Sequence, residues 1–506
     1  MNLEQPRDSS TAGSMLAPPA LDNLFVSVRN IDAMAGPIES AMGMVVRRLT
    51  AMARSVEQAV GDADQQTSAC PVHRAARLLV DRLTRHAVRE TDFGPTSMGQ
   101  IHPHGSVIGI LAHLAAASTN ANTVVRQSSR AAHEMEHEAT TSVARWLGFD
   151  VGRCRGAIVS GGSMGNLTGL HAARTWARRS HPHARLAVVV GPTTHYSINK
   201  MAEILDLAVV TVGDHPLAPM SAEDAVRGVS DARKGDMIPI AIVGVAGATE
   251  SGLVDDLKGI ADVCRKERLW FHVDAAYGGP YAMIDAALAD GMSRFDSIVV
   301  DPHKMLLLQY PVSLVYRRID VWPDGTVPAH EGASTMMPDA RYLAVEYDPD
   351  SHLGAHRIEG SMSAYGAYAL WLLTHAVERD DIAAVLTRAN ALAQHIYQRV
   401  IRESKDLVVV TDRLPVLNTT LIALAERGDT VEEHEARLAR IHRRLVAETP
   451  HYVSLDAGLG FAGRSVLRVV ITHPHTHIED VDSLFVSLDR LACEESGTRA
   501  SAPAQS

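Results

Sequence analysis

Between residues 156 and 316 the chain alternates short apolar runs, rich in β-branched residues, with segments that mostly show helical periodicity. The runs lie at 156–160, 186–190, 208–212, 238–245, 269–273, 297–300 and 313–316. Runs that are apolar on both faces suit strands of a mostly parallel sheet covered by helices. The sequence therefore predicts an α/β fold around a mostly parallel, seven-stranded sheet.

The flanking segments predict further parts of the molecule. Helical periodicity covers 21–90 and recurs at 111–117 and 133–147, the last ending at Gly148. From about residue 380, helices and short strands mix, which predicts a smaller α+β domain. Its expected elements are helices 382–401, 431–448 and 478–491 and strands 407–411, 416–425 and 466–472. We expect disordered tails at 1–20 and 493–506, a helical segment at 21–100, a large domain at 101–380 and a small domain at 381–492.

Composition excludes several classes of partner. The chain has 506 residues, is 46% hydrophobic and carries a net charge of −11, which argues against nucleic-acid binding. No apolar run reaches the length of a membrane span, and the N-terminus does not resemble a secretory signal. The four cysteines are scattered without CxxC spacing, so we expect reduced thiols in a cytoplasmic protein without a metal site.

Two neighbouring runs each lead to an ionisable side chain. Asp274 follows Phe271-His272-Val273, and Lys304 follows Asp301-Pro302-His303 after the next run. A buried carboxylate is unfavourable unless paired, so Asp274 is either a helix cap or ion-pair partner, or a functional group. Burial would lower the pKa of Lys304 and favour its neutral, nucleophilic form. Such an amine and carboxylate suit pyridoxal phosphate, whose aldehyde forms a Schiff base with lysine and whose ring nitrogen an aspartate keeps protonated.

A glycine-rich segment, 160–167, follows the first run and opens a helix that ends near Arg179. Its sequence is Ser-Gly-Gly-Ser-Met-Gly-Asn-Leu. Such a turn lets backbone N–H groups approach an anion at a helix N-terminus, and the Ser163 hydroxyl adds a donor. Gly162, Ser163 and Met164 are therefore candidate phosphate-binding residues. A plain tight turn is the alternative, which the presence of Asp274 and Lys304 disfavours.

Three further residues are candidates for contact with the cofactor ring. His195 lies in Thr194-His195-Tyr196-Ser197 after the second run, and its imidazole could stack on the ring. Ala276 is small and would share a strand face with Asp274. Thr249 follows another strand, and its hydroxyl could position Asp274 or the ring hydroxyl. The alternatives are a loop histidine and a turn threonine that bonds its own backbone.

Together these segments resemble the group II pyridoxal-phosphate-dependent amino-acid decarboxylases, which include glutamate, aromatic-amino-acid and histidine decarboxylases. The resemblance covers roughly 90–490, and its most specific motifs are HVDAAYGG at 272–279 and DPHK at 301–304. The other matches, in family order, are 102–103, 120–123, 135–136, 160–167, 194–197, 247–252, 360–361 and 467–474, and the C-terminal match is the weaker one.

The resemblance implies the fold of the pyridoxal-phosphate-dependent transferases, fold type I (aspartate aminotransferase-like), and a homodimer with active sites at the interface. It implies that Lys304 is the Schiff-base lysine and Asp274 the partner of the pyridinium. His195 would stack on the ring and Ala276 would pack on its other face. Gly162, Ser163 and His303 would lie near the phosphate.

Some positions depart from the family pattern. Asp301 stands where several relatives have asparagine, Met362 follows Gly360-Ser361 where a subset has arginine, and Arg130 stands where relatives often have proline. Residues 339–343 resemble the mobile loop whose tyrosine protonates the substrate carbon, which makes Tyr342 a catalytic candidate. A tyrosine that packs a loop is the alternative.

The resulting hypothesis is decarboxylation of an L-amino acid to its amine and CO2. The loop at 94–101 is neutral and partly apolar, so we expect a neutral substrate side chain, aliphatic before aromatic, unless Arg126 faces the site. The nearest alternative is a carbon–carbon lyase similar to sphingosine-phosphate lyase, which would release an aldehyde in place of CO2. An aminotransferase and a non-catalytic binding protein on the same fold are further alternatives.

Overall fold

The computed structural model describes residues 94–320 and 357–496, with gaps at 104, 125, 214, 216 and 459–462, and a few residues between 36 and 41. Tyr342, the expected tail at 1–20, residues 497–506 of the expected tail at 493–506 and nearly all of the 21–100 segment lie outside the described residues. Residues 493–495 of the second expected tail belong to the last described helix. The expected domain boundaries stay a prediction.

The large sheet has seven strands in the order β1-β7-β6-β5-β4-β2-β3. β7 pairs antiparallel with both β1 and β6, and the pairs among β6, β5, β4, β2 and β3 are parallel. The expected mostly parallel sheet is thus confirmed, although its first strand begins at Cys154. The strands are β1 (Cys154–Val159), β2 (Leu186–Val190), β3 (Ala208–Thr211), β4 (Ile238–Val245), β5 (Trp270–Asp274), β6 (Ser297–Val300) and β7 (Ser313–Arg318).

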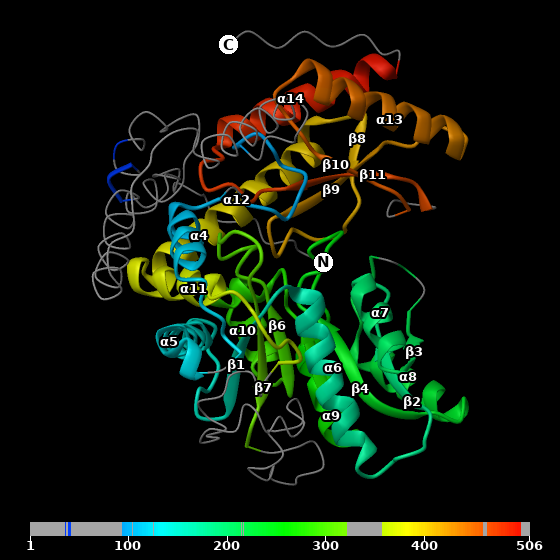
Figure 1. The fold of residues 1–506 in the computed structure, drawn as a ribbon. Coiled ribbons are helices and arrows are strands. Elements are labelled where there is room, and N and C mark those ends of the chain that lie inside the picture. Colours follow the sequence, from blue (N-terminus) through cyan, green and yellow to red (C-terminus); the bar gives the residue numbers. More distant parts are fainter. Residues whose placement is uncertain are drawn as a thin grey trace, which may run out of the picture.

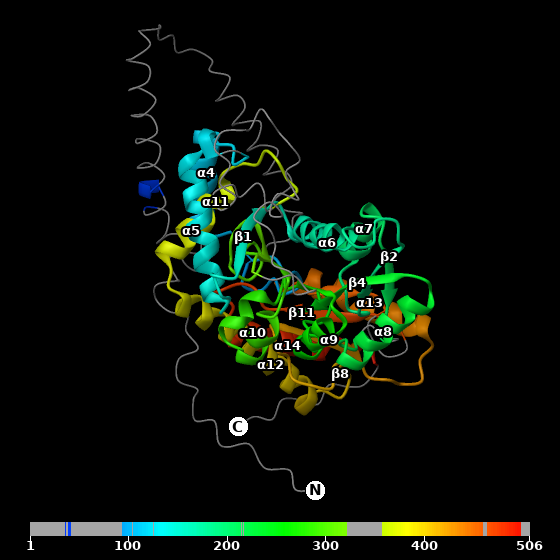
Figure 2. The ribbon, with the colours of Figure 1, turned by 90° about the horizontal axis from the view of Figure 1, so that it is seen from below.

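Helices cover both faces of this sheet (Figure 2). Successive strand residues point to opposite faces, so Val188 packs in the apolar cluster with α6 and α7, and Val189 packs in the cluster with α8 and α9. The covering helices are α6 (Gly162–Arg178), α7 (Tyr196–Ile204), α8 (Ala222–Lys234), α9 (Leu257–Glu267) and α10 (Ala286–Met292). This double cover explains why the strands are apolar on both faces.

Three more helices, α4 (Val107–Thr119), α5 (Arg130–Trp146) and α11 (Tyr365–Ala376), lie together beside β1 (Figures 1 and 2). α5 stops just before Gly148, whose φ of +78° is the left-handed conformation that glycine adopts readily after a helix. Short 3₁₀ turns are η1 (Arg126–Ser128) and η2 (Gly279–Met283).

A buried guanidinium fastens the chain that re-enters the described structure at Arg357. Its Nη1 donates to Glu136 Oε1 on α5 and to the Ile158 carbonyl on β1, both at 3.0 Å. Its Nη2 donates to the Thr123 carbonyl at 2.8 Å, and the Ile158 N–H donates to Glu136 at 2.9 Å. Arg357 and Glu136 are each 1% exposed. One ion pair therefore joins α5, β1 and the segment before α11.

The smaller sheet is antiparallel, in the order β10-β11-β9-β8, and lies with α12, α13 and α14 above the large sheet in Figure 1. Residues near Met98 also join this part, because Met98 pairs with the backbone of Tyr452 and Val470. β10 was not predicted. The elements are α12 (Arg379–Glu403), β8 (Leu407–Val409), β9 (Thr419–Leu424), α13 (Val431–Glu448), β10 (Ser454–Asp456), β11 (Val466–Val470) and α14 (Ile478–Glu495).

Among the described helices, none is long and apolar enough to cross a membrane. The described residues likewise contain no cluster of histidine, cysteine and carboxylate side chains arranged to bind a metal ion.

Candidate active site

The carboxyl ends of β1, β4, β5 and β6 meet at one edge of the large sheet, where a cavity of about 390 Å³ opens. Ligand sites of open α/β sheets form at this edge. Every candidate residue from the sequence that the structure describes lines this one cavity: Gly162, Ser163, Met164, His195, Thr249, Asp274, Ala276, His303 and Lys304. They come from separate segments of the chain, so only the fold brings them together.

Asp274 ends β5 and is held by donors on both carboxylate oxygens. Asn166 Nδ2 donates to Oδ2 at 3.0 Å, and the Ala276 N–H donates to Oδ1 at 3.2 Å. Asp274 is only 7% exposed. Both of these donors are neutral, so the buried carboxylate still needs a positively charged partner. A cationic ring nitrogen bound in the cavity can be that partner.

A chain of hydrogen bonds holds the side chain of Asn166 in place. Burial lowers the pKa of His272 to about 4, so its ring is neutral near pH 7. His272 Nε2–H donates to Asn166 Oδ1 at 3.0 Å, Nδ1 accepts from the Ser297 hydroxyl at 2.8 Å, and Trp270 Nε1–H donates to Ser297 Oγ at 2.7 Å. The order of donors directs the Asn166 amide hydrogens toward Asp274.

Sequence reasoning assigned no role to Asn166 or His272. Asn166 was visible as a polar residue on the apolar face of a helix, one turn before the buried Leu170. His272 was visible as a histidine within an apolar strand. Their contact with each other depends on how α6 packs on β5.

Lys304 follows β6, and its Nζ lies 3.0 Å from Asp301 Oδ2. Burial alone would lower the pKa of Lys304, as the sequence led us to expect. The nearby carboxylates of Asp301 and Asp274 outweigh burial, so the pKa of Lys304 is instead raised. With Asp301 as its counter-ion, the amine is an ammonium group.

The N-terminus of α6 forms the cradle expected from the glycine-rich segment. Gly161 is the N-cap residue, and no hydrogen bond from an N-cap side chain occupies the first N–H groups of the helix. A Cβ at Gly162 would lie 2.8 Å from Asp301 Oδ2, so a larger residue here would require Asp301 to shift. Ser163 and Met164 follow in the first turn. An uncapped helix N-terminus on a cavity attracts an anion.

His195 is the N-cap of α7, and its Nδ1 accepts from the Ser197 N–H at 3.3 Å. Burial lowers the pKa of His195, although Asp274 opposes this, so the ring is neutral and carries its proton on Nε2. Ala276 lies two residues beyond the end of β5, so it does not share a strand face with Asp274, but it lines the same cavity.

Thr249 lines the cavity, and its carbonyl accepts from Arg468 on β11 at 2.7 Å, which ties this loop to the smaller sheet. His303 Nδ1–H donates to the Val312 carbonyl at 2.5 Å, and burial lowers the pKa of its ring. Tyr310, which was not a candidate, also lines the cavity. Its ring centroid lies 4.0 Å from that of His303.

These groups fit pyridoxal phosphate. One amine, one buried carboxylate and one uncapped helix N-terminus share a single cavity, as an aldehyde, a ring nitrogen and a phosphate require. Residues 90–419 match the model of the pyridoxal-dependent decarboxylase conserved domain. The chain belongs to this family. Pyridoxal phosphate is accordingly its cofactor.

Curated relatives of the chain differ in substrate. It is 25% identical to an aromatic-L-amino-acid decarboxylase of Bacillus atrophaeus, over 78% of this chain and 82% of the relative. It is 27% identical to an aspartate 1-decarboxylase of Aliivibrio fischeri, over 67% of this chain and 66% of the relative. Membership of the family therefore leaves the substrate open.

Among solved structures, the fold matches that of Oryza sativa TDC with PLP and tryptamine, with a TM-score of 0.74 and 19% identity. The match covers 93% of this chain and 99% of the rice chain. The expected fold type I is confirmed.

Proposed function

We propose that this decarboxylase converts an L-amino acid with a neutral side chain to its amine and CO2. The observation that carries the proposal is the cavity in which Lys304, Asp274 and the α6 N-terminus meet, within a chain of the decarboxylase family. When bound, the cofactor supplies an electron sink for the bond that breaks at the substrate's α-carbon.

Each lining residue has a distinct task in this proposal. Lys304 binds the cofactor aldehyde, and Asp274, fixed by Asn166, pairs with the ring nitrogen. The other candidates hold the phosphate (Gly162, Ser163, Met164 and His303), flank the ring (His195 and Ala276) or support its hydroxyl (Thr249). Neutral His195, with its proton on Nε2, can donate a hydrogen bond to the substrate carboxylate without protonating it, and the carboxylate must stay ionised to leave as CO2.

The attachment of the cofactor is tested by Lys304→Ala. Without the amine, the absorbance band of the covalently bound cofactor should disappear, because no other described lysine lines the cavity. Lys258→Ala is the control, since Lys258 pairs with Asp290 on the molecular surface. If the band persisted unchanged in Lys304→Ala, the assignment would be wrong.

A proton must reach the α-carbon after CO2 leaves, and we propose Tyr342 as its donor. Tyr342→Phe should lower the rate of amine formation by about 10²–10⁴-fold, the usual contribution of a positioned acid, with little change in cofactor affinity. Tyr310→Phe, which removes a phenol that lines the cavity, should cause a smaller loss. Equal rates for wild type and Tyr342→Phe in single-turnover measurements would refute this role.

The neutral substrate is supported by what the cavity offers. Arg126 pairs with Glu134 at 3.5 Å and does not line the cavity. No arginine is among the described lining residues, and burial lowers the pKa of His195 and His303. Within the described chain, an acidic side chain would therefore find no cation besides Lys304. A screen of the proteinogenic amino acids for CO2 release tests this, and aspartate or glutamate as the best substrate would contradict it.

One observation keeps the carbon–carbon lyase as a second candidate. Ser361, in the Gly360-Ser361 pair, accepts from Asn122 at 2.9 Å, and nearby Glu359 accepts from the Ser160 N–H at 3.0 Å. This segment therefore lies beside the cradle. The products separate the two functions, because a lyase of this type releases an aldehyde and a decarboxylase releases CO2.

We also propose a homodimer with active sites at the interface, in the cytoplasm. The resemblance to the family supports the first, and the free thiols of Cys154 and Cys264, both buried, are consistent with a reducing compartment.

A further inference from the structure

A second cavity, of about 330 Å³, lies at the edge of the large sheet opposite the candidate active site. Cys154 at the start of β1, Phe295 just before β6 and Arg318 at the end of β7 all line it. The two cavities share no lining residue. A ligand at this edge would therefore bind outside the candidate active site.

Four arginines from four different segments of the chain line this second cavity. They are Arg153 before β1, Arg265 on α9, Arg294 after α10 and Arg318 at the end of β7. The only other charged residues among its described lining are two aspartates, Asp150 and Asp290. Four positive charges thus face two negative ones, although the chain as a whole carries a net charge of −11. The cavity therefore has the opposite sign of charge to the whole chain.

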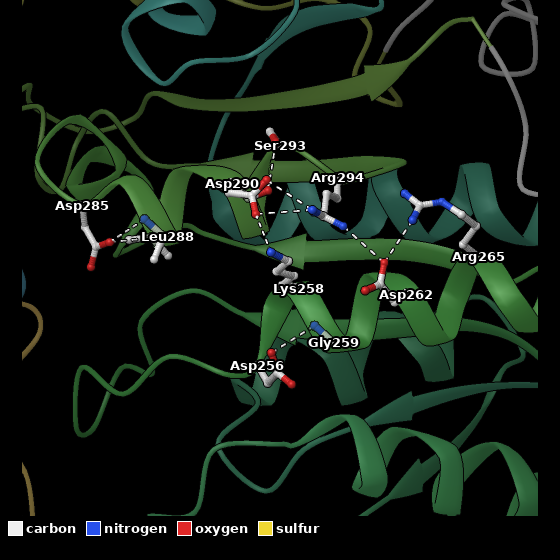
Figure 3. Close-up of polar contacts among 11 residues, drawn as sticks. Asp256, Lys258, Gly259, Asp262, Arg265, Asp285, Leu288, Asp290, Ser293 and Arg294 are labelled. Carbon is white, nitrogen blue, oxygen red and sulfur yellow. Dashed lines mark hydrogen bonds and ion pairs between the residues drawn. The ribbon is translucent and has the colours of Figure 1, made fainter.

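Shared carboxylates hold two of these arginines in place. Asp262 accepts from Arg265 Nη1 at 3.0 Å and from Arg294 Nη1 at 3.2 Å (Figure 3). Asp290 accepts from Arg294 Nη2 at 3.3 Å and also pairs with Lys258 at 3.5 Å. Two carboxylates here pair with three cations, so one positive charge remains without a carboxylate of its own.

The other two arginines share a carboxylate in the same way. Asp320 accepts from Arg153 Nε at 2.5 Å and from Arg318 Nε at 2.6 Å. Within the described part of the chain, both Nη groups of Arg153 and Nη1 of Arg318 make no hydrogen bond. Burial raises the pKa of nearby Asp296 to about 7, so its carboxyl group offsets only part of the positive charge near pH 7. A guanidinium group has five N–H donors, so both arginines keep donors for a ligand.

We propose that this cavity binds a phosphate group, either as the free ion or as part of a small phosphate ester. Guanidinium groups match phosphate oxygens with paired N–H donors, and the excess of positive charge on the lining suits a dianion. Asp262 and Asp320 do not line the cavity, so they orient the arginines without occupying the space for the ligand. The volume is that of a small-molecule site. This site is separate from the proposed decarboxylation and does not depend on it.

Equilibrium dialysis of the cofactor-loaded protein against radiolabelled inorganic phosphate tests the site, because the cofactor then occupies the cradle at α6. At an ionic strength held constant with potassium chloride, we expect saturable binding of about one phosphate per chain. Arg294→Gln and Arg318→Gln should each weaken this binding by about tenfold or more, because charge-assisted hydrogen bonds to the phosphate are lost. Neither change leaves an aspartate unpaired, since Arg265, Lys258 and Arg153 remain.

Arg444→Gln is the matched control. Arg444 belongs to a similar ion-pair network between α13 and α14, in which its partners Glu448 and Glu494 also pair with Arg490. Its loss removes one positive charge outside the cavity, so phosphate affinity should equal that of wild type. Circular dichroism and the absorbance of the bound cofactor show whether each variant is folded. Wild-type phosphate affinity in both folded cavity variants, or binding that does not saturate, would overturn the inference.

The unmodified protein gives a second measurement, which does not depend on the folding of any variant. Phenylglyoxal modifies exposed arginine side chains, and those of Arg153 and Arg265 are more than half exposed. Phosphate should slow the modification of these two arginines, followed by peptide mass spectrometry, and should leave that of Arg130, outside the cavity, unchanged. Absence of this protection would overturn the inference.

Glycerol 3-phosphate distinguishes the two sources of the phosphate group. If it displaces labelled phosphate at a lower concentration than unlabelled phosphate does, the ligand is an ester whose remaining atoms also contact the cavity. Equal or weaker displacement favours the free ion. Both results support the site, whereas no displacement by unlabelled phosphate would overturn it.

Discussion

At the scale of single residues, the side chains that line the cavity were largely predictable and their supports were not. Asp274 and Lys304 follow apolar runs, and the ends of buried strands are visible in the sequence. Asn166 and Tyr310 had no such position, because their importance depends on which helix packs on which strand. The charge of Lys304 was misjudged for the same reason: Asp301 is close in space, and its effect exceeds that of burial.

The support behind Asp274 can be tested by Asn166→Ala. The change leaves Asp274 Oδ2 and His272 Nε2 without these partners, and an unsatisfied buried polar group costs about 1–3 kcal/mol. We expect a lower free energy of unfolding in denaturant titrations and weaker cofactor binding in absorbance titrations.

Thr168→Ala, on the same helix, is the control for Asn166→Ala. The Thr168 hydroxyl is buried without a hydrogen-bond partner in the described structure, so its removal should leave cofactor affinity close to that of wild type. Equal cofactor affinities in the two variants would show that Asn166 does not support the site.

At the scale of secondary-structure elements, the periodicity of the sequence located each strand of the large sheet to within two residues. The short β10 was missed because three residues, Ser454–Asp456, carry too little pattern to distinguish a strand from a loop. Ala276 was assigned to a strand that ends at Asp274, because the apolar pattern continues past the last residue of the strand.

The cradle is a property of the α6 N-terminus, and paired glycine substitutions test it. In Gly162→Ala the new methyl group would meet Asp301, which must shift, so we expect cofactor affinity to fall about tenfold, equivalent to about 1.4 kcal/mol. In Gly161→Ala the methyl group meets nothing within 4 Å, and the φ of 176° suits any residue. Equal losses in both variants would argue against close contact at Gly162.

At the scale of the whole molecule, long-range pairing was the least predictable feature. The backbone of Met98 joins Tyr452 and Val470 of the smaller sheet, although more than 350 residues separate them in sequence. Neither segment has a local sequence pattern that identifies the other as its pairing partner. The position of β7 between β1 and β6 was similarly hidden, since apolar runs reveal strands but not their order.

The proposed dimer predicts complementation between inactive chains. If Tyr342 acts in the partner's site, a hybrid of Lys304→Ala and Tyr342→Phe chains contains one site with both native residues. Co-expression of the two variants, with separate tags to purify the hybrid, should therefore restore activity to about half that of wild type. A hybrid as inactive as its parents would place Tyr342 in the site of its own chain, and a monomer in sedimentation experiments would refute the dimer.

The pair formed by Arg357 and Glu136 has a consequence for how this chain can change over generations. Loss of either side chain would leave the other as an unpaired buried charge and would lower the free energy of unfolding by about 3–5 kcal/mol. Replacement of both by apolar residues would be far less destabilising. Because Ile158 bonds to both partners two residues before the glycine-rich turn, a single loss would also disturb the coenzyme. The two positions should therefore mutate in concert or stay fixed.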